Sequence, residues 1–196
     1  MQRDGTTPSS QRASCGSGSA RMTFVCISHP ATSTNARIYQ RVRIAGVATQ
    51  MRPMQDEEFV AWLPLLREDY AQDLVRDYGM SADSASTQAV AEIDGHRPAG
   101  HSVFVIEVEG EPVGHLWLVE RRDAYGPTLV VYDIDVDEPF RGRGYGKAAM
   151  VFIEEEARRR GLTRIALHVG ARNDVARNLY LSLGFEENEV AMSKPI

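Results

Sequence analysis

The chain has 196 residues, of which 43% are hydrophobic and 25% charged, and its formal net charge is −5. This length suits one domain with a sizeable core, and the composition is that of a soluble globular protein. No apolar run reaches the roughly 18 residues that a transmembrane helix needs, and the N-terminus lacks the apolar segment of a secretory signal peptide. We therefore expect a cytoplasmic protein that does not bind membranes.

Charge is unevenly divided between the first 50 residues and the rest. Residues 1–50 carry six arginines and one acidic side chain, whereas the remainder carries 16 basic and 26 acidic side chains. An acidic body argues against a nucleic-acid-binding domain and mildly favours a cationic substrate such as an amine. We expect no nucleic-acid partner.

Residues 1–46 form a leader that is rich in Ser, Thr, Gly and Arg and has no sustained apolar period. We expect it to be disordered and dispensable. An organelle transit peptide, or a basic arm that contacts nucleic acid or membrane, has a similar composition, so these alternatives stay open. Cys15 and Cys26 both lie here, and we expect free thiols because two cysteines are poor evidence for a zinc site or a disulfide framework.

Residues 47–196 form the expected folded domain, which opens with a strand at 48–54. Residues 56–78 carry a helical apolar stripe, and we expect Pro64 to split it into two helices. Ser81 is a suitable N-cap for a further helix that runs to about Ile93.

Strands and helices alternate after residue 100. Strands are predicted at 102–109, 113–120, 128–136, 164–169 and 190–193, and helices at 147–160 and 174–183. The first two of these strands flank the turn sequence Gly-Glu-Pro at 110–112 and predict a hairpin. This order of elements predicts a mixed α/β fold.

A loop of glycines and arginines joins a predicted strand end to a helix start within residues 135–150, DVDEPFRGRGYGKAAM. Its glycines let the backbone approach an anion closely, and the first amides of the helix direct free N–H groups at it. A Rossmann fingerprint fails because Lys147 stands where the last glycine is needed. Walker A fails because Arg141 and Ala148 replace its first glycine and its Ser or Thr. The remaining pattern, R-x-x-G-x-G, predicts a pyrophosphate site.

This pattern, with the strand before it, resembles motif A of the GNAT superfamily of N-acetyltransferases. The family's second signature follows at the family's spacing, as Asn173, Ala176, Tyr180, Gly184 and Phe185. The resemblance covers about residues 48–196. It implies the GNAT acyl-CoA N-acyltransferase fold, in which a twisted mixed sheet flanked by helices splays between its fourth and fifth strands around the cofactor. It also implies acetyl-CoA as co-substrate, without a metal.

In the family the loop amides bind the pyrophosphate of acetyl-CoA, and the end of the preceding strand pairs its backbone with the pantetheine arm. Carried over residue by residue, the resemblance implies the cofactor-binding residues Ile134, Asp135, Val136, Arg141, Gly142, Arg143, Gly144, Tyr145, Gly146, Lys147 and Asn173. Asn173 is also a good N-cap for the helix at 174–183, and that role alone would explain it.

Two residues are candidates for catalysis. Tyr180 matches the family's tyrosine that donates a proton to the coenzyme A thiolate, although a core position on its amphipathic helix would also explain it. His168 is the sharpest candidate for the general base, because some relatives place a catalytic glutamate there and imidazole titrates near neutral pH. Asp133 and Asp135 are the alternative bases, on one face of a strand from which Tyr132 faces away. A structural histidine is the competing explanation for His168.

His96 and His101 could suggest a metal pair, but without nearby Cys or acidic ligands at the usual spacing we expect no metal site.

These residues predict an acetyl-CoA-dependent N-acetyltransferase that acts on a primary amine by direct transfer in a ternary complex, because no cysteine lies in the domain to carry the acetyl group. The acceptor stays open between a small amine, an antibiotic, a polyamine and a protein N-terminus, since residues 56–100 and 121–127 carry no readable signature. A non-catalytic acyl-CoA-binding regulatory module is the alternative, and Tyr180 argues against it. The sequence leaves open whether the protein is a monomer or a homodimer.

Overall fold

The computed structural model of the chain describes residues 40–44, 47–95, 101–123, 126–190, 192 and 194. They form one six-stranded sheet in which spatial order follows sequence order. Its strands are β1 (Gln40–Ile44), β2 (Val47–Pro53), β3 (His101–Val108), β4 (Glu111–Asp123), β5 (Gly126–Val136) and β6 (Arg164–Leu167). The first five pair antiparallel, and β6 joins β5 in parallel. The predicted mixed α/β fold is confirmed.

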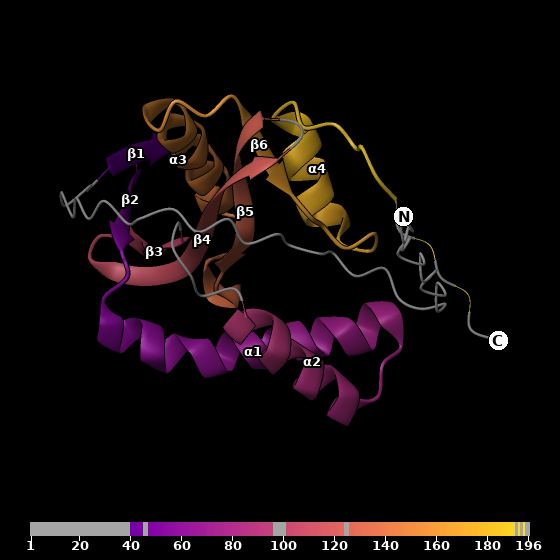
Figure 1. Cartoon of the computed structure of the whole chain (residues 1–196). Helices are drawn as coiled ribbons and strands as arrows, with labels where there is room; N and C mark the ends of the chain where they lie inside the picture. The colour runs from indigo at the N-terminus through magenta and orange to yellow at the C-terminus, as the bar shows by residue number, and fades with distance from the viewer. Residues whose placement is uncertain are drawn as a thin grey trace, which may run out of the picture.

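Two pairs of helices cover the two faces of the sheet (Figure 1). On one side lie α1 (Asp56–Tyr78) and α2 (Ala82–Gly95), and on the other α3 (Tyr145–Arg159) and α4 (Asp174–Ser182). None of the helices in the described part of the chain combines the length and apolar character needed to span a bilayer. The sheet is therefore covered by one layer of helices on each face.

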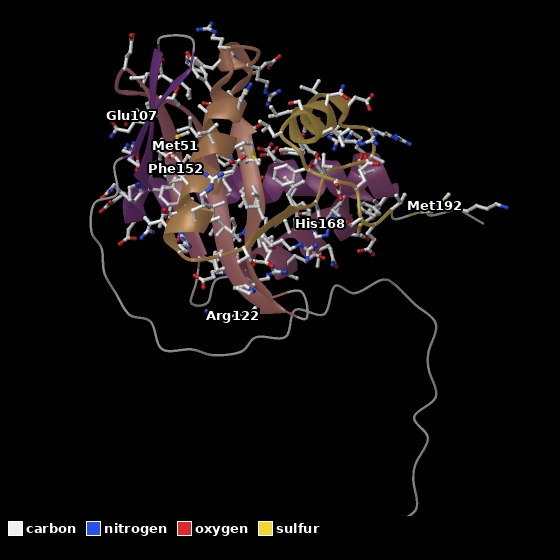
Figure 2. The ribbon with its side chains drawn as sticks, turned by 90° about the horizontal axis from the view of Figure 1, so that it is seen from above. Met51, Glu107, Arg122, Phe152, His168 and Met192 are labelled. Atoms are coloured by element: carbon white, nitrogen blue, oxygen red, sulfur yellow. The ribbon has the colours of Figure 1, made fainter. Side chains whose placement is uncertain are left out.

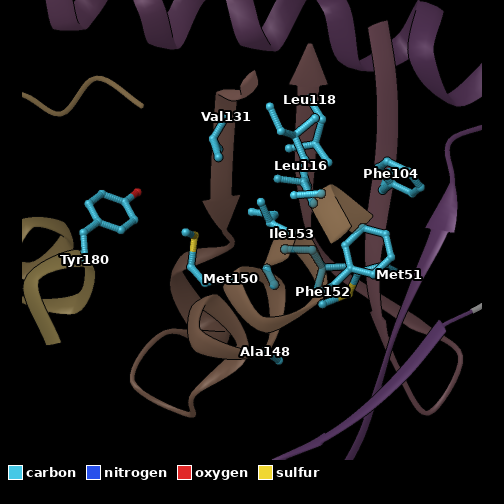
Figure 3. Close-up of a cluster of buried hydrophobic side chains, with 14 of the residues drawn as sticks. Met51, Phe104, Leu116, Leu118, Val131, Ala148, Met150, Phe152, Ile153 and Tyr180 are labelled. Atoms are coloured by element: carbon cyan, nitrogen blue, oxygen red, sulfur yellow. The ribbon is translucent and has the colours of Figure 1, made fainter. Parts of the chain in front are cut away.

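Each face of the sheet has its own hydrophobic cluster. The larger cluster packs α3, through Met150, Phe152 and Ile153, against Leu116 and Leu118 of β4 (Figure 3). The smaller cluster packs α1 and α2 against the opposite face and contains Leu66, Ile93, Trp117, Val119 and Val130. Period-two alternation along β4 explains the division, because successive side chains of a strand point to opposite faces.

The start of the folded domain and the position of the hairpin turn differ from the prediction. The sheet begins with β1, inside the stretch assigned to the leader, so the boundary after residue 46 falls between two paired strands. Residues 1–39, with both cysteines, lie outside the described residues. The hairpin between β3 and β4 turns at Glu109 and Gly110, both with positive φ, as a tight two-residue turn requires.

The predicted last strand is not formed at residue 190, and Val190 is 72% exposed. Residues 191 and 193 of that prediction lie outside the described residues.

The prediction that Pro64 splits the first helix is wrong, because α1 continues through it. A proline inside a helix removes one backbone hydrogen bond and strains the preceding turn, but need not end the helix. Here Phe59 lies before the proline and Leu66 and Leu74 after it, and all three are buried. The free energy gained by burying these three side chains on one continuous helix outweighs the loss of one backbone hydrogen bond at Pro64.

The C-terminal end of α3 is fixed by a buried carboxylate. Glu156, whose side chain is 1% exposed, accepts hydrogen bonds from Arg159 at 2.6 Å and from Arg160 at 2.8 Å. Arg160 also donates to Ser102 Oγ of β3 at 3.1 Å, which ties the helix to the sheet. Burial would raise the pKa of Glu156, but the two arginines outweigh it and hold that pKa below its ordinary value.

We expect Glu156→Gln to lower the free energy of unfolding by about 2 kcal/mol at neutral pH, because it removes the charge that two arginines bind. The lowered pKa means that the ionised carboxylate stabilises the folded protein above its ordinary pKa and stops doing so as the pH falls through its folded value. The difference from wild type should therefore shrink in acid. Urea unfolding at several pH values measures it.

Glu154→Gln is the matched control on the same helix. Glu154 pairs with Arg158, whose side chain is 68% exposed, so its loss should cost under about 0.5 kcal/mol. Equal effects of the two substitutions would contradict the role of Glu156.

Candidate active site

The sheet opens between β5 and β6. These strands pair from Thr128 with Arg164 to Val131 with Leu167, and no further. Beyond this point, which we call the splay, β5 continues to Val136 while pairing with β4 alone. Unpaired backbone groups at a strand edge can bind an extended, amide-containing ligand. The opening lies where the family resemblance implied it, between the fourth and fifth of the expected strands, which are β5 and β6 of the structure.

An extra residue in β5 marks the splay. In the register with β4, Trp117 faces Asp133 whereas Leu118 faces Val131, so Tyr132 is the extra residue of a β-bulge in β5. The Tyr132 ring lies 4.7 Å from that of Trp117, and the Asp133 carboxylate contacts His115 of the same strand β4. Tyr132 and Asp133 therefore lie on the same face, and the expectation that Tyr132 faces away from Asp133 is wrong.

Close approach of backbones fixes the end of β5 against β4. Gly114 lies opposite Val136, and a Cβ there would overlap the Asp135 carbonyl oxygen. After Val136 the Asp137 amide donates to the Val113 carbonyl at 3.0 Å, so the strand end is held from one side only.

The glycine–arginine loop leads from this strand end into α3. Gly142 and Gly144 have backbone φ angles of 76° and 87°, which residues other than glycine rarely adopt. Gly144 is the N-cap of α3, and the Ala148 amide makes the first helical bond to its carbonyl at 3.0 Å. The amides of Tyr145, Gly146 and Lys147 consequently have no acceptor within the helix and can bind an anion.

The two loop arginines are partly engaged with the loop itself. Arg141 Nε donates to the Val136 carbonyl at 2.7 Å, and its Nη2 lies 3.2 Å from the Asp135 carboxylate. Arg143 donates to the Pro139 carbonyl at 3.0 Å. Both side chains remain exposed, so they shape the loop and add positive charge beside it.

Burial, the largest influence, raises the pKa of Asp135 above its ordinary value although the Arg141 charge opposes it.

Asn173 is the N-cap of α4, because its Oδ1 accepts a hydrogen bond from the Ala176 amide at 3.1 Å. The cap that the sequence offered as a sufficient explanation is confirmed. A contact between Asn173 and a cofactor stays a prediction.

Tyr180 projects from α4 toward β5 and is 9% exposed (Figure 3). Burial, with a smaller contribution from the negative charge of Asp133, raises the pKa of the phenol, so it stays protonated at neutral pH. Its hydroxyl has no hydrogen-bond partner in the described part of the chain, where Arg67 Nε is the one fully buried polar side-chain atom that lacks a partner. The hydroxyl is therefore open to solvent and can donate a proton to a ligand.

His168 lies one residue beyond β6, and its side chain is exposed (Figure 2). Nothing in the residues that the structure describes hydrogen-bonds to its ring. Of the proposed metal pair, His96 lies outside the described residues, and His101 accepts a hydrogen bond from Trp117 Nε1 at 2.7 Å.

Sequence reasoning missed His115. Its Nε2 lies 2.7 Å from Asp133 Oδ2, its side chain is 15% exposed, and Trp62 of α1 covers it with ring centroids 4.6 Å apart. A histidine at an inward position between Val113 and Trp117 was the available signal. The partner was not readable, because it depends on a bulge in the neighbouring strand.

The cap assignment predicts that Asn173→Ala lowers the free energy of unfolding by about 1 kcal/mol, since the Ala176 amide loses its acceptor. Asn178→Ala is the control, at an exposed interior position of the same helix, where alanine is the better helix former. Thermal unfolding without ligand measures both. A destabilisation by Asn178→Ala as large as that by Asn173→Ala would contradict the cap.

Comparisons with known proteins agree with this geometry. The sequence model of the "Acetyltransferase (GNAT) family" matches residues 57–185. The uncharacterized N-acetyltransferase YycN of Bacillus subtilis is 32% identical over 152 residues, which cover 74% of this chain and 97% of that protein. Its crystal structure superimposes with a TM-score of 0.66 over 76% of this chain and 98% of YycN.

Two further matches have names that state an activity. A mycothiol acetyltransferase of Thermobispora bispora is 35% identical over 136 residues, which cover 68% of this chain but 44% of that protein. The aminoglycoside N-acetyltransferase AAC(6′)-Iy, in complex with CoA, has a TM-score of 0.53 at 19% identity, covering 79% of this chain and 99% of that one. At that identity the likeness supports the fold alone.

Proposed function

Because the chain belongs to the acetyltransferase (GNAT) family, we propose that it transfers an acetyl group from acetyl-CoA to a primary amine. One observation carries the proposal. The part of β5 that lacks β6 as a partner leads directly into the glycine–arginine loop and the free amides of α3, with the open hydroxyl of Tyr180 across the splay.

The donor site follows from this arrangement. The pantetheine arm, which contains amides, would pair with the backbone of β5 at Ile134, Asp135 and Val136. The pyrophosphate would lie on the loop and the first turn of α3, beside Arg141 and Arg143. Asn173, at the start of α4, would contact the cofactor in addition to capping its helix.

The reaction needs a neutral amine, a polarised thioester carbonyl and a proton for the leaving thiolate. The amine nitrogen attacks the carbonyl carbon, the C–N bond forms and the C–S bond breaks. Tyr180 would protonate the thiolate, for which its raised pKa keeps the phenol proton available at neutral pH. Direct transfer is favoured because the sequence has no cysteine after Cys26 to carry an acetyl group.

The acceptor is proposed only as a primary amine, on a small molecule or a protein. The sequence candidates for its base are His168 and the carboxylates of Asp133 and Asp135. His168 is exposed beyond β6, whereas the carboxylates lie on β5 beside the splay.

Calorimetric titration with acetyl-CoA tests the donor site. We expect micromolar binding by wild type and binding weaker by tenfold or more in the double variant Arg141→Ala, Arg143→Ala, about 1.4 kcal/mol or more. The pair Arg76→Ala, Arg158→Ala removes two arginines that are 55% and 68% exposed elsewhere and should leave the affinity unchanged. Absence of binding by wild type would refute the acetyltransferase proposal.

Release of thiol from acetyl-CoA tests the reaction, with tyramine, spermidine, kanamycin and a short peptide with a free N-terminus as acceptors. We expect Tyr180→Phe to lower kcat about 100-fold while the affinity for acetyl-CoA stays unchanged, because only the proton donor is lost. Tyr78→Phe, on a side chain that is 65% exposed at the end of α1, is the control. Full activity of Tyr180→Phe would exclude Tyr180 as the acid, and binding without turnover of any amine would favour a regulatory acyl-CoA-binding module.

A further inference from the structure

His115 and Asp133 form a buried pair, which we call the dyad, beside the splay. The carboxylate of Asp133 can only accept, so His115 Nε2 carries the proton of the 2.7 Å hydrogen bond. This bond leaves the other ring nitrogen, Nδ1, as the acceptor of the neutral imidazole. A carboxylate that fixes the tautomer of a histidine in this way prepares the opposite nitrogen to act as a base.

The Nδ1 atom of His115 is available for a ligand. Within the described residues it has no hydrogen-bond partner, and Arg67 Nε is the one unpartnered polar side-chain atom there that is fully buried. Nδ1 is therefore accessible to solvent, although the side chain as a whole is 15% exposed. The ring of Trp62 packs on the imidazole and restricts its rotation.

The dyad lies beside the stretch of β5 that the proposed function assigns to the pantetheine arm. His115 is in register with Asp135, within the stretch of β5 that has no β6 partner. The charge of Asp133 acts on His115 through the hydrogen bond and contributes to the raised pKa of Tyr180. The charge of Asp133 thus acts on both the imidazole and the phenol.

We propose that His115, oriented by Asp133, is the general base that removes a proton from the acceptor ammonium. This inference rests on the proposed acetyl transfer and assigns to its acceptor side a residue that sequence reasoning did not consider. It replaces His168 as the base, since His168 is exposed beyond β6 and the described residues hold no carboxylate hydrogen-bonded to its ring.

The proton balance is as follows. The acceptor ammonium gives one proton to Nδ1 of neutral His115, which later releases it to solvent. The resulting amine attacks the thioester carbonyl, and the C–S bond breaks as Tyr180 gives its proton to the sulfur. The amine nitrogen then loses a second proton as the amide forms, and this proton restores Tyr180 through solvent. One ammonium and one thioester give one amide, one thiol and one released proton.

Several groups set the charge state of His115. Burial lowers the pKa of its imidazole, but the hydrogen bond and charge of Asp133, with the charges of Asp135 and Asp137, outweigh burial and raise that pKa above its ordinary value. Trp62 of α1 packs on the ring and Val105 is the β3 residue in register, and neither side chain is charged. Activity should therefore rise with pH through a value above the ordinary histidine pKa.

The test compares His115→Gln, Asp133→Asn and His168→Gln, using acetyl-CoA and whichever acceptor of the four-amine screen gives the fastest thiol release. We expect His115→Gln to lower kcat about 100-fold and to abolish the acidic limb of its pH profile. Asp133→Asn should move that limb to lower pH, because the pKa of His115 falls without the carboxylate. His168→Gln should keep the wild-type profile.

Two further measurements distinguish a failure of the inference about His115 from a failure of the proposed acetyl transfer. Calorimetry should show unchanged acetyl-CoA binding in each variant, and NMR titration of the ring protons, with coenzyme A present, should show a His115 pKa that falls in Asp133→Asn. An inactive wild type would refute the proposed function. An active wild type with an unchanged profile in His115→Gln, or an NMR titration of His115 that Asp133→Asn does not move, would overturn the inference. Loss of the limb in His168→Gln would assign the base to His168 instead.

Discussion

The bulge at Tyr132 is the constraint on which the site depends. One residue more in β5 than in β4 reverses the side-chain alternation, so that Asp133 lies on the same face as Tyr132 and reaches His115. The same irregularity falls one residue after β5 stops pairing with β6. A bulge increases the local twist of a strand and bends it. The bulge at Tyr132 therefore accounts both for the opening between β5 and β6 and for the orientation of the Asp133 carboxylate.

Different interactions hold the two sides of the splay: backbone pairing on the side of β4, and apolar packing on the side of α4. Toward β4, the strand end is fixed by backbone pairing and by a contact at Gly114 that leaves no room for a side chain. Toward α4, the contacts are those of Tyr180, Phe185 and other apolar side chains packed on the larger cluster. Backbone hydrogen bonds set distances more narrowly than apolar packing. The strand side is thus suited to position a ligand, and the helix side to adapt to it.

The sequence predicted those parts of the molecule that depend on neighbouring residues. The loop glycines, the start of α3 and the cap at Asn173 follow from local backbone requirements, and the structure has them within two residues. Features that depend on contacts across the sheet were either not predicted or predicted wrongly. The continuity of α1 through Pro64 comes from burial against β4, and the pairing of β1 with β2 cannot be inferred from five residues with two apolar positions. The partnership of His115 with Asp133 requires the register of two strands, including its bulge.

The separation of the core into two clusters has a consequence for how this protein can change over evolution. The larger cluster joins α3 and α4 to the sheet around the glycine–arginine loop, whereas the smaller joins α1 and α2 to the opposite face through Trp117 and Val130. Substitutions in contact couple energetically, and distant ones mostly add. Mutations that reshape α1 and α2 can therefore accumulate without disturbing the side of the sheet that carries the glycine–arginine loop, where the proposed donor site lies. Libraries that aim to change the proposed acceptor preference should accordingly be confined to the face that bears Trp62.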